Sequence, residues 1–156
     1  MANKFAARKM FDEGVAAYVK KDYKASLDLF SRAIKYDVSL ALFFVCRGAA
    51  SLKLGRAHNA IGDFNKAIKR DPTYARAFHL RGLAYEKLGE LARAFQDFDR
   101  SLEIDPEFGA AYHSRNSMLS KPKASTLAFR DFEIANHLMA MRLTQFDDNV
   151  LSDLEI

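Results

Sequence analysis

Residues 41–74 read ALFFVCRGAASLKLGRAHNAIGDFNKAIKRDPTY, and residues 75–108 read ARAFHLRGLAYEKLGELARAFQDFDRSLEIDPEF. Placed one above the other, the two stretches are equal in length and match at several positions. The matching pairs are Gly48 and Gly82, Gly55 and Gly89, Ala60 and Ala94, Phe64 and Phe98, and Pro72 and Pro106. A period of this length is typical of stacked units that cannot bury their apolar side alone. The sequence therefore predicts an all-α repeat array.

The same frame extends to both sides of these two stretches. It predicts four units of two helices each, over residues 7–40, 41–74, 75–108 and 109–142. We expect Gly55 and Gly89 to end first helices, because glycine readily adopts the left-handed conformation of a C-cap. Pro72 and Pro106 are expected to end second helices, because proline disfavours helix at the residue before it. We assign residues 1–142 to the repeat domain and 143–156 to an acidic C-terminal capping helix or tail.

The positions of the small and aromatic residues resemble the tetratricopeptide repeat. That repeat has Gly at the eighth place, Ala at the twentieth, an aromatic residue at the twenty-fourth and Pro at the thirty-second, as in residues 41–74. The resemblance implies a right-handed superhelical solenoid of four helix-turn-helix repeats plus a C-terminal helix. It also implies a small adaptor or scaffold, in which the first helices line a concave groove that binds a partner protein.

The resemblance places the peptide-binding groove at a set of positions on the first helices. They are Phe11, Val15, Leu42, Val45, Ala49, Lys53, Arg76, His79, Leu80, Leu83, Lys87 and His113. The first two units supply mainly apolar residues and the last two mainly cationic and hydroxyl residues. A partner peptide or amphipathic helix with apolar anchors at one end and acids at the other would match. The alternative for Phe11 and Val45 is packing against adjacent helices.

One subclass of the family binds the acidic C-terminal tails of heat-shock chaperones through a clamp of two Lys, two Asn and one Arg. Starting at the first unit, the clamp places hold Phe11, Val15, Cys46, Arg76 and Leu80. Starting at the second unit, none of the five residues matches. The sequence therefore departs from the clamp subclass.

The charge of the chain is unevenly distributed. The 156 residues include 24 basic and 20 acidic ones. Residues 143–156 hold Asp147, Asp148, Asp153 and Glu155 and no base. This segment either docks on the body or on another copy, or is a solvated cap. There are two alternatives to the adaptor function. One is a structural protein that self-assembles through its ends or its acidic tail, and the other, a minor alternative, is a basic RNA-associated module.

Other classes of protein and site are not expected. No stretch approaches about 18 apolar residues, so we expect no membrane span, and the first residues lack the apolar run of a secretory signal. The single cysteine, Cys46, favours a reducing compartment, the cytoplasm. We find no nucleophile–base pair, metal-ligand set or cofactor motif, and we predict a non-enzymatic protein. Acidic pairs such as Asp97 and Asp99 are interpreted as solvated.

Overall fold

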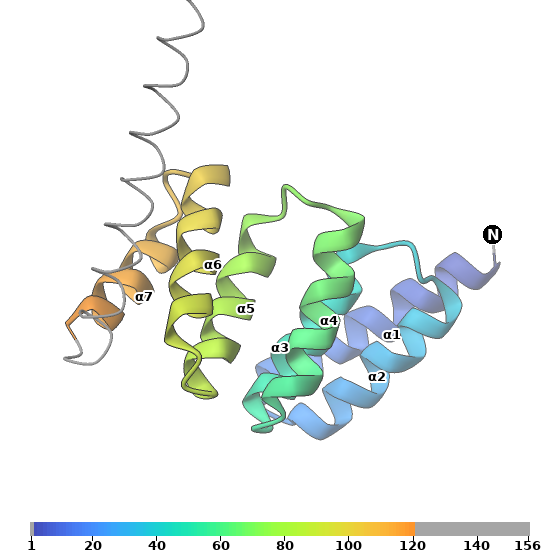
Figure 1. Ribbon diagram of the computed structural model, residues 1–156. Helices are drawn as coiled ribbons and strands as arrows, with labels where there is room; N and C mark the ends of the chain where they lie inside the picture. Colours follow the sequence, from blue (N-terminus) through green and yellow to red (C-terminus); the bar gives the residue numbers. More distant parts are fainter. Residues whose placement is uncertain (1, 121–156) are drawn as a thin grey trace, which may run out of the picture. The chain divides into compact units, whose positions relative to one another are not determined.

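The computed structural model of the protein describes residues 2–120, which form helices and no strands (Figure 1). The helices are α1 (Ala2–Val19), α2 (Tyr23–Tyr36), α3 (Ala41–Lys53), α4 (Ala57–Arg70), α5 (Ala75–Lys87), α6 (Leu91–Ile104) and α7 (Gly109–Leu119). The chain divides into two compact units, Met1–Asn116 and Ser117–Ile156. The second helix of the last predicted repeat and the segment 143–156 lie outside the described residues.

The helices of the first unit stack as consecutive pairs (Figure 1). Helix α1 packs on α2, α3 on α4, and α5 on α6, while α2 meets α3 and α4 meets α5. Helix α3 also contacts both α1 and α5. The first helices of successive pairs are therefore neighbours and form one face, and the predicted all-α array of helix pairs is confirmed. Within residues 2–120, no helix has the length and apolar character needed to cross a membrane.

The turns inside the pairs use the left-handed conformation predicted from the sequence. Gly55 has a φ of 75° and Gly89 a φ of 76°, each two residues after its helix ends. In the first pair the corresponding residue is Lys21, whose φ is 63°. The glycine caps are confirmed, and the first pair makes the same turn with a residue that adopts this conformation at a cost.

Small residues let the two helices of a pair approach closely. A β-carbon added to Gly48 would lie 2.6 Å from the ring of Phe64, and one added to Gly82 would lie 2.6 Å from the ring of Phe98. Both phenylalanine rings are fully buried. Glycine at these places on the first helix therefore makes room for the aromatic side chain of the second helix.

Two buried ion pairs repeat with the period of the fold. Arg47 Nη2 lies 2.7 Å from Asp63 Oδ1 and its Nε donates to Asp63 Oδ2 at 2.8 Å. Arg81 and Asp97 make the same two bonds at the same distances. The interpretation of Asp97 as a solvated residue is wrong, because its side chain is only 7% exposed and both its oxygens accept from a guanidinium.

Candidate functional site: a two-pocket groove on the first helices

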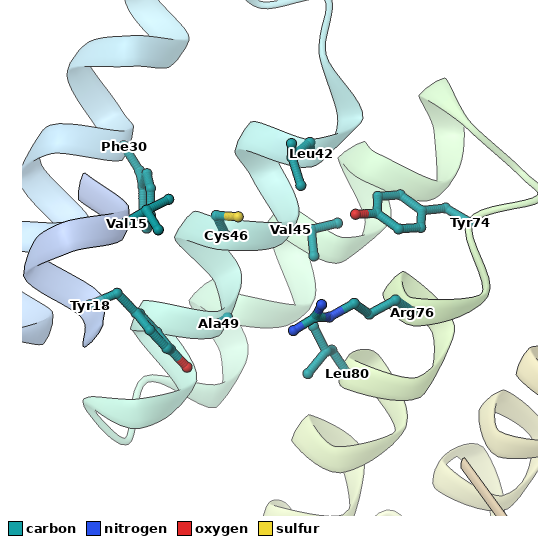
Figure 2. Close-up of a pocket in the computed structure, with 10 residues that line it drawn as sticks. All are labelled: Val15, Tyr18, Phe30, Leu42, Val45, Cys46, Ala49, Tyr74, Arg76 and Leu80. Atoms are coloured by element: carbon teal, nitrogen blue, oxygen red, sulfur yellow. The ribbon is translucent and has the colours of Figure 1, made fainter. Parts of the chain in front are cut away.

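The face formed by α1, α3 and α5 contains a pocket of about 190 Å³ (Figure 2). Most of its wall is apolar, and three polar side chains, Tyr18, Tyr74 and Arg76, reach it from different elements. Among the described residues, its lining is Val15, Tyr18, Phe30, Leu42, Val45, Cys46, Ala49, Tyr74, Arg76 and Leu80. We call this the first pocket.

A second pocket of about 330 Å³ adjoins the first. Both are lined by Tyr18, Ala49 and Leu80, so they form one continuous groove, which we call the groove from here on. The other residues of the second pocket are Leu52, Lys53, Leu83, Glu86 and Lys87.

Most of the groove residues predicted from the sequence lie in these two pockets. The structure brings together Val15, Leu42, Val45, Ala49, Lys53, Arg76, Leu80, Leu83 and Lys87. Their depth differs: Leu42 is 42% exposed, whereas Val45 is 3% exposed and packs with Phe44, Ala67 and Ala77. Leu42 is thus an accessible wall residue, and Val45 is part of the core that supports the wall.

Phe11 lies in the core of the first two helix pairs and lines neither pocket. Its ring stacks on Phe43 with 4.8 Å between ring centroids and lies 5.5 Å from the ring of Phe30. Phe11 therefore packs against adjacent helices, which was the alternative to a place in the groove.

The two histidines predicted for the groove are also separate from its pockets. His79 is buried, its Nε2 lies 2.9 Å from Ser114 Oγ, and its ring packs edge-on against Phe108. Burial lowers the pKa of His79, and the nearby Arg76 charge lowers it further. His113 is exposed on α7 and lines neither pocket.

Two residues that line the first pocket lie outside the first helices and were not predicted from the sequence. Phe30 reaches the first pocket from α2, and Tyr74 lies just before the first residue of α5. The resemblance places the groove on first helices only, so neither residue is expected there. A signal existed for Tyr74, because the equivalent position of the next repeat holds another aromatic residue, Phe108.

The thiol of Cys46 and the phenols of Tyr18 and Tyr74 in the first pocket stay protonated near neutral pH. Burial raises the pKa of the Cys46 thiol to about 11 and also raises the pKa of the Tyr18 and Tyr74 phenols. The thiol is therefore a small apolar contact, and the two phenols are hydrogen-bond donors. Among residues 2–120, no group of three or more His, Cys, Asp or Glu side chains is placed to hold a metal ion.

The cations of the groove differ from those of the core. Arg47, Arg81 and Arg115 each pair with an aspartate. Arg76 is exposed and makes no hydrogen bond or ion pair with any other described residue, although it lies in a mostly apolar pocket. The charge of Arg76 is thus available to an external anion.

Comparison with known proteins agrees with this architecture. The family model described as tetratricopeptide repeat matches residues 75–108, and a second, described as TPR repeat, matches residues 52–89. The TPR domain of Arabidopsis OM64 is 30% identical, over 74% of this chain and 95% of that one, with a TM-score of 0.72.

Two similar structures contain bound peptides. The second TPR of Spaghetti (RPAP3), bound to the HSP90 peptide SRMEEVD, is 33% identical over 67% of this chain and 96% of that one, with a TM-score of 0.64. The second TPR domain of human RPAP3, in complex with the HSP70 peptide SGPTIEEVD, is 28% identical over 77% and 98%, with a TM-score of 0.70. The chain has the repeats and the stacked helix pairs, and it is 30% identical to the OM64 domain and 33% identical to the second TPR of Spaghetti. It therefore belongs to the tetratricopeptide repeat family.

Proposed function

We propose that this protein is a non-catalytic adaptor whose groove binds a peptide segment of a partner protein. The observation that carries the proposal is the pair of adjoining pockets on α1, α3 and α5, apolar in the middle and bordered by exposed cations. Pockets with an apolar lining and a few convergent polar groups are the usual binding sites of folded proteins. The peptides bound by the two RPAP3 relatives support the choice of a peptide as the ligand.

The ligand is expected to carry both apolar and acidic side chains. Leu42, Leu80 and Leu83 offer apolar contacts, whereas Arg76 and Lys87 offer positive charge. Burial of apolar surface would supply most of the affinity, and the charges would select among partners and speed encounter.

The chaperone peptides of the relatives are not the expected ligand. Of the five clamp places, Val15, Cys46, Arg76 and Leu80 line the first pocket, and three of these four side chains cannot donate a strong hydrogen bond to a carboxylate. We propose that the apolar residues at these places exclude an acidic chain end, since a carboxylate placed against them would lose its water without gaining a partner.

A displayed library of random peptides, selected on the immobilised protein, tests the proposal. Synthetic copies of the selected peptides are then measured by fluorescence anisotropy against wild type, Ala49→Glu and Leu42→Asp. Ala49 lines both pockets and Leu42 is exposed, so both variants alter the groove with little change to the core. We expect each to weaken binding by about tenfold or more.

Gln96→Glu is the matched control, because it adds the same charge at an exposed position of α6, outside both pockets. It is expected to bind like wild type. Peptides that bind wild type, Ala49→Glu and Leu42→Asp equally would contradict the proposal, as would a selection that recovers no peptide on wild type.

A further inference from the structure

We infer that the groove reads an internal peptide segment in which apolar residues are flanked by an acid on each side. The inference rests on the proposed function and specifies the ligand of the same groove. It differs from the sequence-based expectation, in which apolar anchors lie at one end of the ligand and acids at the other.

The first observation is the order of side chains along α5. Arg76, Leu80, Leu83 and Lys87 all line the groove. Their spacing of four, three and four residues places them on one face of the helix. The wall that α5 offers is therefore cation, apolar, apolar, cation. The two cations are eleven positions apart along the helix, which corresponds to about 16 Å.

The second observation is that α3 adds no acid to this wall. It contributes Ala49 to the apolar middle, Leu42 to the end where Arg76 lies, and Lys53 to the same end of the groove as Lys87. Glu86, the one acidic residue among the described residues that line the groove, lies at that end as well. Positive charge thus flanks the apolar stretch on both sides, with Arg76 at one end and two lysines against one glutamate at the other.

The third observation concerns the polar groups next to Arg76. The phenols of Tyr18 and Tyr74 line the same pocket, and neither makes a hydrogen bond with another described residue. Figure 2 shows the Arg76 guanidinium extending over the pocket between these two tyrosines. A cation with neutral hydroxyl donors nearby suits a carboxylate, which accepts from both kinds of donor.

The pocket volumes favour an extended ligand. At about 190 Å³, the first pocket is smaller than the range typical of sites for small molecules, and it suits one apolar side chain. The second pocket is larger, at about 330 Å³, and continues the groove along α5. An extended peptide rises about 3.3 Å per residue, so two acids that reach Arg76 and Lys87 would stand about four to six residues apart.

This arrangement differs from that of the peptides bound by the relatives. In SRMEEVD all the acids lie within the last four residues. In that peptide the acids on either side of the single Val are only two residues apart. In the inferred ligand the two flanking acids stand about four to six residues apart, and no chain end is needed in the groove.

The test uses the peptides selected on wild type as described above. We expect them to share two acids about four to six residues apart with apolar residues between. Anisotropy measurements should show that Arg76→Gln and Lys87→Gln each weaken binding of the best peptide by about fivefold. Lys69→Gln, which removes an exposed charge of α4 outside the pockets, is expected to have no effect.

A rearranged version of the best peptide, with both acids moved to its C-terminal end, should bind more weakly than the original. Selected peptides that depend on Ala49 and Leu42 but carry acids at one end only, or none, would overturn the inference and leave the proposed function standing. Equal binding by wild type, Arg76→Gln and Lys87→Gln would overturn it too. Peptides that bind Ala49→Glu and Leu42→Asp as tightly as wild type would contradict both this inference and the proposed function.

Discussion

The ring of Phe98 covers Gly82 so closely that a β-carbon on the glycine would lie 2.6 Å from ring atom Cε1. The same β-carbon would lie 3.1 Å from the carbonyl oxygen of Ala94. Overpacking of this kind costs about 1–3 kcal/mol, and the better helix propensity of alanine returns about 1 kcal/mol. We therefore expect Gly82→Ala to lower the free energy of unfolding by up to about 2 kcal/mol, measured by urea denaturation.

Gly62 provides the matched control for this prediction. It lies within α4, is exposed, and has nothing within 4 Å of an added β-carbon. Gly62→Ala should raise the free energy of unfolding by about 1 kcal/mol, because only the gain in helix propensity remains. A Gly82→Ala protein that is stabilised as much as Gly62→Ala would contradict the close approach of α5 and α6.

The ion pair between Arg81 and Asp97 is expected to matter for stability because the aspartate is buried. Arg81→Met would leave a carboxylate without its charged partner, at a cost of about 2–3 kcal/mol. The exposed pair of Arg100 and Glu103 gives the control, and Arg100→Met should change the unfolding free energy by less than about 0.5 kcal/mol. If urea denaturation shows equal losses of stability for the two substitutions, the burial of Asp97 does not make its ion pair more important for stability.

Lys21 adopts a left-handed conformation that the other two pairs assign to glycine. Lys21→Gly should raise the melting temperature, since the strain of a side chain at this φ is about 1 kcal/mol or more and exceeds the extra entropy that glycine loses on folding. Gly89→Ala should have the opposite effect for the same reason. Differential scanning calorimetry checks both, and a lower melting temperature for Lys21→Gly would show that the lysine is not strained.

Burial of His79 makes stability depend on pH. Its pKa in the folded protein is lowered by burial and then by Arg76, so folding favours the neutral ring. The stabilisation is fully present above the unfolded pKa of about 6.5, and it is lost as the pH falls through the lower, folded pKa. In urea denaturation, the free energy of unfolding of wild type should be lower at about pH 5.5 than at about pH 7.5. In His79→Gln this decrease should be smaller. A folded-state pKa of about 6.5 or above, measured by NMR titration of the ring, would contradict this.

The sequence predicted the repeat well because a few positions are strongly constrained. Gly48 and Gly82 leave no room for a side chain, and Gly55 and Gly89 have positive φ, so these residues recur and reveal the period. Helices α3, α5 and α7 begin at residues 41, 75 and 109, the first residues of the predicted units. The second helix of the fourth unit and the helix or tail over residues 143–156 stay predictions.

The groove was predictable in outline but not in depth. The period locates Phe11 and His79 on first helices, but it cannot show that their rings turn toward neighbouring helices, because this depends on partners such as Phe43 and Phe108 from other elements. The burial of Asp97 was missed for a similar reason. Its partner Arg81 lies on the preceding helix, and the clue was the occurrence of the same pair in the preceding repeat.

The most direct test of the proposed groove is an NMR map of the bound peptide. The tightest peptide from the displayed library is titrated into the isotope-labelled protein, and backbone amide shifts are followed residue by residue. We predict the largest changes in α1, α3 and α5, around Val15, Ala49, Arg76 and Leu83. Changes concentrated on the exposed faces of α4 and α6, with these residues unmoved, would contradict a groove on the first helices.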